Sequence, residues 1–160
     1  LTIIIPRHID RVKKIIEELL KFNLSIVLYS KLSQIDTKTD ILLVDSYGET
    51  LKFYNISKCV FLGKSLVKSL IKDGGQNPIE PARLGCKILH GPYVSNFAET
   101  YEHLRKLGVT KKINNSNELS LSLVEEFKED KAKNQEIAAK IENYGQNILN
   151  NVIMELKKYI

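Results

Sequence analysis

The chain has 160 residues and a mass of 18.3 kDa, which is the size of one ordinary domain. Its composition, 43% hydrophobic and 27% charged with 8 Gly and 4 Pro, is typical of a globular protein. This composition excludes the disordered, collagen-like and disulfide-scaffold classes. No apolar run approaches the roughly 20 residues that a membrane-spanning helix needs.

The excess positive charge of +5 is confined to the first two thirds of the chain. Residues 1–110 hold 16 Lys and Arg against 11 Asp and Glu, whereas residues 111–160 hold 8 of each. No block of five or six like charges occurs, and aromatic residues do not alternate with arginine as in single-strand binding proteins. An anionic small molecule or a lipid surface therefore fits the charge as well as a polynucleotide, and a solvated lysine-rich surface needs no partner at all.

Short apolar, β-branched runs alternate with stretches of helical period, which is the pattern of parallel strands joined by crossover helices. The runs predict strands over residues 1–5, 25–29, 41–44, 59–62, 87–89 and 109–113. The stretches between them predict helices over residues 11–22, 49–56, 78–84 and 96–107. Asp10 is expected to cap the first helix, and Gly85 and Gly108 to end the last two. The fold class is thus α/β, a Rossmann-like doubly wound parallel sheet.

From Asn117 onward the sequence predicts helices without strands. One apolar stripe comprises Leu119, Leu123, Val124 and Phe127, and a longer one comprises Ile137, Ile141, Tyr144, Ile148, Val152 and Leu156. Such stripes most often pack onto the domain's own sheet, and a coiled coil with a partner is the alternative. We expect residues 1–116 to form the core and residues 117–160 to be helices packed on the same single domain. Because Leu1 begins an apparent strand, we also expect the chain to be part of a longer one.

The cysteines and histidines predict no metal site and no cofactor. Cys59 and Cys86 each begin an apolar run, as small hydrophobic residues of buried strands do, which indicates a reducing compartment. Two isolated cysteines match no zinc spacing, and the three histidines form no local pair. Walker A, GxGxxG, HExxH and GxSxG motifs are absent from the sequence, which disfavours ATPase, dinucleotide oxidoreductase, zinc hydrolase and esterase functions.

Ligands of open α/β sheets bind beyond the carboxyl ends of the strands, and the loops there are residues 6–8, 45–49 and 74–81. The double glycine and the Asn-Pro of the third loop predict a turn into a helix whose N-terminus would attract phosphate. Glu80, in the first turn of that helix, either balances the helix dipole or accepts hydrogen bonds from a ribose diol.

The two earlier loops carry similar features. Gly48-Glu49 repeats the combination of a glycine and an acidic first turn at the head of another helix. Asp45 is expected to be a capping residue, with a role as a ligand group as the alternative. Arg7 follows the first strand and is the cation best placed to reach a phosphate, because a guanidinium matches phosphate oxygens well.

Five motifs follow one another along the chain: Ile5-Pro6-Arg7-His8, Asp45-Ser46-Tyr47-Gly48-Glu49, the run Phe61–Val67, the run Gly74–Ala82 and the run His90–Phe97. In this order they resemble the motifs of the 3-deoxy-D-manno-octulosonic acid (Kdo) transferase family, and the resemblance covers residues 1 to about 110 closely and the helical tail loosely. The family adds Kdo from CMP-Kdo to the lipid A precursor in lipopolysaccharide biosynthesis of Gram-negative bacteria. The resemblance implies that this chain is the C-terminal, donor-binding half of a GT-B type glycosyltransferase.

The resemblance also implies which residues hold CMP: Pro6, Arg7, Tyr47, Gly48, Glu49, Asn77, Pro78, Ile79 and Glu80. The family's catalytic carboxylate, proposed as the base that activates the acceptor hydroxyl, lies in the N-terminal domain, so no catalytic residue is expected in this chain. We therefore expect the chain alone to bind CMP or CMP-Kdo weakly and to transfer nothing.

The partners implied are the CMP-Kdo donor and, through the N-terminal domain, the lipid A precursor, with no nucleic acid. The parent enzyme is expected at the cytoplasmic face of the bacterial inner membrane, and this piece of it is expected to be soluble. Lys64, Lys68 and Lys72 would share one face if residues 65–72 were helical, where they would attract an anionic membrane or simply face water.

Two positions depart from the family pattern. Gln76 stands where the family usually has His, and residues 68–73 are longer than the usual connection before the double glycine. Two alternatives stay open: another GT-B transferase or epimerase that uses a UDP-sugar, and a non-catalytic module whose basic surface binds anionic lipid or nucleic acid.

Overall fold

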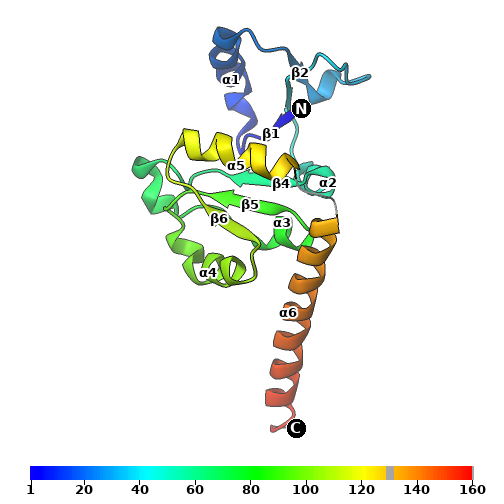
Figure 1. Cartoon of the computed structure of the whole chain (residues 1–160), viewed down its shortest axis with the longest axis vertical. Helices are drawn as coiled ribbons and strands as arrows, with labels where there is room; N and C mark the ends of the chain where they lie inside the picture. The colour runs from blue at the N-terminus through cyan, green and yellow to red at the C-terminus, as the bar shows by residue number, and fades with distance from the viewer. Residues whose placement is uncertain (129–131, 160) are drawn as a thin grey trace. The chain divides into compact units, whose positions relative to one another are not determined.

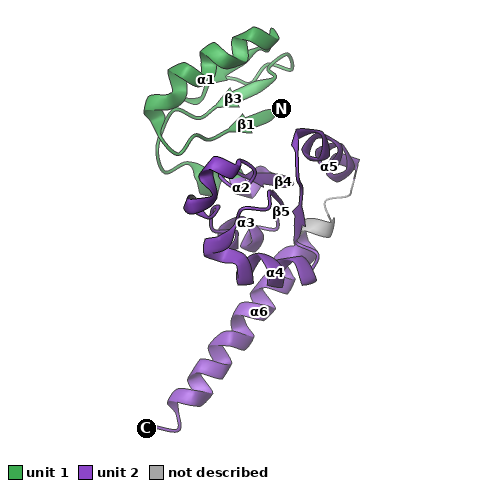
Figure 2. Ribbon diagram, turned by 90° about the vertical axis from the view of Figure 1, so that its left-hand side faces the viewer, with its two compact units in different colours: residues 1–53 green, residues 54–160 purple. Residues whose placement is uncertain are grey.

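The structure is a computed structural model that describes residues 1–128 and 132–159. The chain divides into two compact units, residues 1–53 and 54–160 (Figure 2). Each unit holds a three-stranded sheet in which every pairing is parallel. The predicted α/β class with parallel strands is therefore confirmed. The division of the chain into a core of residues 1–116 and a helical tail stays a prediction. The boundary between the two compact units lies elsewhere, after Phe53.

In unit 1 the sheet has the order β1-β3-β2, formed by β1 (Thr2–Ile4), β3 (Ile41–Leu43) and β2 (Ile26–Leu28). Thr2 and Ile26 both pair with Ile41, so the three strands are in register. The central strand β3 is buried along its whole length, as expected for a continuous Ile-Leu-Leu run between two parallel neighbours. The helix α1 (Val12–Leu19) joins β1 to β2, and α2 (Thr50–Ile56) runs from unit 1 into unit 2.

The start of α1 differs from the sequence prediction. Three-residue 3-10 helices precede and follow it, at Ile9–Arg11 and Leu20–Phe22. The N-cap position is held by Arg11, which already has helical φ and ψ angles of −78° and −13° and makes no side-chain cap. The prediction that Asp10 caps this helix is wrong, because the 3-10 turn leads into the helix and places Asp10 inside a helical turn.

In unit 2 the order is β4-β5-β6, formed by β4 (Cys59–Leu62), β5 (Lys87–His90) and β6 (Thr110–Lys112). The helices are α3 (Ile79–Arg83), α4 (Ala98–Lys106), α5 (Ser116–Lys128) and α6 (Ala132–Leu156) (Figure 1). 3-10 helices occupy Lys68–Asp73 and Ser95–Phe97, and another occupies Tyr29–Lys31 in unit 1. Gly85 and Gly108 follow α3 and α4 closely with φ of 79° and 74°, as predicted for residues that end helices.

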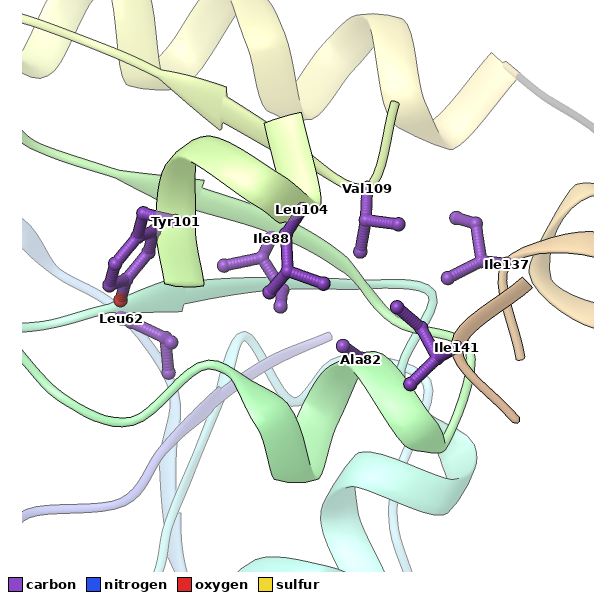
Figure 3. Packing of buried hydrophobic residues seen from close by; sticks show 8 residues of the cluster. All are labelled: Leu62, Ala82, Ile88, Tyr101, Leu104, Val109, Ile137 and Ile141. Atoms are coloured by element: carbon purple, nitrogen blue, oxygen red, sulfur yellow. The ribbon is translucent and has the colours of Figure 1, made fainter. Parts of the chain in front are cut away.

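The core of unit 2 joins its sheet to three helices (Figure 3). Ile88 of β5 packs with residues of α3, α4 and α6, and the buried cluster comprises Leu62, Ala82, Ile88, Tyr101, Leu104, Val109, Ile137 and Ile141. The beginning of the long apolar stripe of α6 thus packs within its own unit. Farther along the helix, Ile148, Val152 and Leu156 are exposed, and α6 extends away from the rest of unit 2 (Figure 1). Residues 129–131 and 160 of the predicted helical tail lie outside the described residues.

The two cysteines are free and are parts of the sheet region of unit 2. Cys59 is half-buried in β4, and Cys86 is fully buried just before β5. Burial raises the pKa of Cys59 to about 12 and that of Cys86 to about 11. Both thiols are therefore protonated at neutral pH, as expected of small hydrophobic residues rather than of nucleophiles or metal ligands.

Ile141 and Ile148 provide a matched test of the packing of α6. Ile141 is 5% exposed and Ile148 is 46% exposed on the same helix. We expect Ile141→Ala to destabilise unit 2 by about 2–4 kcal/mol, because it leaves a cavity in the core. Ile148→Ala should change the free energy of unfolding by less than about 0.5 kcal/mol. Urea unfolding measures both, and similar losses in the two variants would contradict the observed packing.

Candidate functional site

In unit 1 the predicted site residues gather at one edge of the sheet. The strands β1, β2 and β3 are parallel, so their carboxyl ends lie at the same edge. Pro6 and Arg7 follow β1, and Tyr47, Gly48 and Glu49 follow β3. Arg7 is exposed, as is 69% of Tyr47, so both side chains are open to a ligand. Gly48 has φ of 84°, a backbone conformation that favours glycine.

The Glu49 carboxylate is held by two partners. Its Oε2 accepts a hydrogen bond of 3.4 Å from the Tyr29 hydroxyl and lies 2.7 Å from Nζ of Lys52. The predicted place of Glu49 in the first turn shifts slightly, because α2 begins at Thr50 and Glu49 precedes it. Tyr29 also packs edge-on against Phe53, with 5.2 Å between ring centroids. The Glu49 side chain is therefore oriented by the 3-10 helix that follows β2 and by the first turn of α2.

Asp45 ties the end of β3 to the end of β2. Its carboxylate accepts hydrogen bonds from the Ser30 amide, at 2.8 Å, and from the Ser30 hydroxyl. The bond from the Ser30 hydroxyl is the main reason why the pKa of Asp45 lies below its usual value. The prediction that Asp45 caps a helix is wrong, because its carboxylate is bonded to Ser30 and α2 begins only at Thr50.

In unit 2 a single buried serine holds the loops at the carboxyl edge of the sheet together. The Ser65 hydroxyl donates to the Leu62 carbonyl at 2.6 Å and accepts from the Gly91 amide at 2.9 Å. The Ser65 carbonyl accepts from the Tyr93 amide at 2.8 Å. The segment after β4 is thus bonded to the segment after β5. A Cβ at Gly91 would lie 2.1 Å from the Ser65 carbonyl oxygen, so this approach requires glycine.

The segment that carries the double glycine lies against the same loops. A Cβ at Gly63 would lie 3.7 Å from Nε2 of Gln76. The Gln76 carbonyl accepts a hydrogen bond of 2.9 Å from the Tyr101 hydroxyl of α4. Gln76 is therefore fixed through its backbone, while its side chain lies beside the segment after β4.

The residues Asn77 to Glu80 form the start of the short helix α3 and the turn before it. Pro78 is buried at the N-cap of α3, and Oδ1 of Asn77 accepts a hydrogen bond of 3.0 Å from the Ile79 amide. Glu80 is exposed in the first turn. The helix has only five residues, so few peptide dipoles add up along it, and one amide at its start is already bonded to Asn77. Charge on a ligand at this edge must therefore be balanced mainly by side chains.

The lysines predicted to share a helix face do not do so. The helical segment is a 3-10 helix over Lys68–Asp73, and it begins only at Lys68. Lys64 lies outside it with φ of 60°, in the left-handed region. The condition for a shared face, a helix over residues 65–72, is therefore not met, and a 3-10 helix has three residues per turn.

Three residues that orient the candidate site were missed as such from the sequence: Tyr29, Ser30 and Ser65. Their partners lie 15 to 26 residues away along the chain, so no local spacing reveals them. The sequence offers two weak signals: Tyr29 and Ser30 directly follow β2, and Ser65 belongs to the motif run Phe61–Val67. Over residues 1–128 and 132–159, no group of His, Cys, Asp and Glu is arranged to hold a metal ion.

Ser65→Ala tests the bonds that hold the loops of unit 2. The variant leaves the buried Gly91 amide without its acceptor, so we expect a loss of about 1–3 kcal/mol in the free energy of unfolding. Ser120→Ala, at an exposed position of α5, should have little effect. Urea unfolding of the two variants makes the comparison. A Ser65→Ala protein as stable as Ser120→Ala would contradict the assigned role.

Comparison with known proteins shows similarity over much of the chain. It is 31% identical over 137 residues to a bifunctional glycosyltransferase/methyltransferase of Fusobacterium nucleatum, an alignment that covers 84% of this chain and 21% of the relative. It is 33% identical over 104 residues to the 3-deoxy-D-manno-octulosonic acid transferase of Haemophilus influenzae, covering 65% of this chain and 23% of that enzyme. The chain thus spans about a fifth to a quarter of these relatives. No family model matches.

A solved structure agrees with the sequence relatives. The crystal structure of the C-terminal CMP-Kdo binding domain of WaaA from Acinetobacter baumannii superposes with a TM-score of 0.77 and 26% identity. The superposition covers 87% of this chain and 72% of that domain. The family resemblance and the fold inferred from the motifs are confirmed: this chain is a relative of the Kdo transferases and is similar to their C-terminal, CMP-Kdo-binding domain.

Proposed function

We propose that this chain binds CMP-Kdo and is the donor-binding domain of a glycosyltransferase that transfers Kdo to the lipid A precursor. The observation that carries the proposal is the likeness in fold and sequence to a domain described as binding CMP-Kdo. The relatives are more than twice as long as this chain, so the transfer reaction is proposed for the parent enzyme.

The proposed roles of the residues follow from their chemistry. Arg7, exposed at the carboxyl edge of unit 1, would bind phosphate through its guanidinium. Glu80, exposed at the start of α3, would accept hydrogen bonds from the two ribose hydroxyls. The rest of the proposed CMP site comprises Pro6, Tyr47, Gly48, Glu49, Asn77, Pro78 and Ile79.

The same groups would assist the departure of CMP. When the bond between Kdo and CMP breaks, negative charge develops on the phosphate. The Arg7 guanidinium beside this phosphate would stabilise the charge, and electrostatic stabilisation of this kind is a main source of rate enhancement in transfer reactions. The base that activates the acceptor hydroxyl is assigned to another part of the parent enzyme, as the family resemblance implies.

We place the parent enzyme at the cytoplasmic face of the inner membrane, because a lipid A precursor is a membrane lipid. Among the helices that the structure describes, none is long and apolar enough to cross a bilayer. The excess of Lys and Arg in residues 1–110 suits both an acidic sugar nucleotide and an anionic membrane surface.

Titration calorimetry with CMP tests the proposal on the chain itself. We expect the wild-type chain to bind CMP more tightly than UDP, which separates this function from that of a UDP-sugar enzyme. Arg7→Ala should weaken CMP binding about tenfold, because a charged hydrogen bond to phosphate is lost. Arg11→Ala, another exposed arginine of unit 1, should retain the affinity. Absence of CMP binding, or a preference for UDP, would contradict the proposal.

A further inference from the structure

Lys64 adopts a backbone conformation that lysine rarely takes. Its φ is 60°, and within the described residues the only other non-glycine residue with positive φ is Asn23. Asparagine tolerates the left-handed region, whereas a lysine there is strained by contact between its Cβ and the backbone. Strained residues of this kind gather at ligand-binding sites, where the surrounding structure holds them in place.

The surroundings of Lys64 do hold it in place. It lies between Gly63, which is beside the Gln76 side chain, and Ser65, whose hydroxyl and carbonyl bond to the segment after β5. These contacts fix both neighbours of Lys64 at the carboxyl edge of the sheet of unit 2. The same edge carries the residues from Asn77 to Glu80 that are proposed to hold CMP, because Gln76 directly precedes them.

An anionic donor bound at the carboxyl edge of unit 2 would need a positively charged side chain there. The proposed CMP residues of unit 2 are Asn77, Pro78, Ile79 and Glu80, which include one carboxylate and no positive charge. The proposed donor carries a phosphate and a sugar carboxylate, so its negative charges would meet another negative charge there. The short helix α3 offers little compensation, since it has five residues. Lys64 is half-buried in the adjoining loop and carries the required charge.

The lysines that follow do not share this position. Lys68 and Lys72 belong to the 3-10 helix, and both are exposed. Lys68 is only four residues from Lys64 but lies beyond the hydrogen bonds of Ser65. It therefore serves as a control for the general effect of a positive charge in this segment.

We infer that Lys64 is a specificity-determining residue that binds an anionic group of the donor, and that its left-handed backbone is retained for this purpose. The inference rests on the proposed function. It extends that function by assigning a cation to the part of the site in unit 2. This electrostatic attraction acts only when the donor is bound, so the affinity for the donor should fall when Lys64 is replaced while the fold is kept.

The experiment compares Lys64→Asn and Lys64→Gly with Lys68→Asn in the whole chain. Asparagine and glycine both tolerate positive φ, so we expect these variants to keep the fold of the wild-type chain, which circular dichroism checks. Their affinity should fall about tenfold in calorimetric titrations, because a charged contact is lost. A loss with CMP assigns the phosphate as the bound group, and a loss with CMP-Kdo alone assigns the sugar carboxylate. Lys68→Asn should keep both affinities.

Other outcomes overturn the inference. Unchanged affinity of the Lys64 variants for CMP and CMP-Kdo would do so, and so would an equal loss in Lys68→Asn. Weaker binding to vesicles of anionic phospholipid with unchanged nucleotide binding would assign Lys64 to a membrane contact instead. A wild-type chain that binds neither CMP nor CMP-Kdo would contradict the proposed function itself, and this inference with it.

Discussion

Parallel strand pairing is the constraint on which the candidate site depends. In a parallel sheet all carboxyl ends fall on one edge, so segments that are distant in sequence meet there. In unit 1 this brings Arg7 to the same edge as Tyr47 and Glu49, and in unit 2 it brings the segment after β4 to the segment after β5. The location of the candidate site therefore follows from strand direction, before any particular side chain is considered.

Side-chain hydrogen bonds then hold in place the loops that follow the strands. Ser30 holds Asp45, Tyr29 orients Glu49, and Ser65 joins the two segments of unit 2. Ser30, Tyr29 and Ser65 are not themselves proposed to touch the donor. They limit the motion of loops that would otherwise lose conformational entropy on binding, which lowers the cost of holding a ligand. The positive charge must come from side chains such as Arg7, because the helices at both edges are short.

The sequence predicted the strands and the core helices well and predicted their caps and loops less well. Cys59–Leu62 has the predicted bounds, because a continuous apolar run identifies a buried parallel strand. The roles expected of Asp10 and Asp45 differ in the structure, because a 3-10 turn precedes α1 and because Ser30, the partner of Asp45, is 15 residues away. Periodicity likewise predicted the apolar stripe of α6, but not that its contact with the core involves Ile137 and Ile141 while Ile148 is exposed.

We propose that residues at the carboxyl edge of each sheet contact the nucleotide of CMP-Kdo. The most direct measurement is the change in backbone amide chemical shifts of the chain, recorded by NMR, as CMP is added. We expect shifts at Arg7, Gly48 and Glu80 that follow the CMP concentration, with unchanged signals at Gly108 and Gly145, which lie away from these edges. Shifts that avoid both carboxyl edges would contradict it.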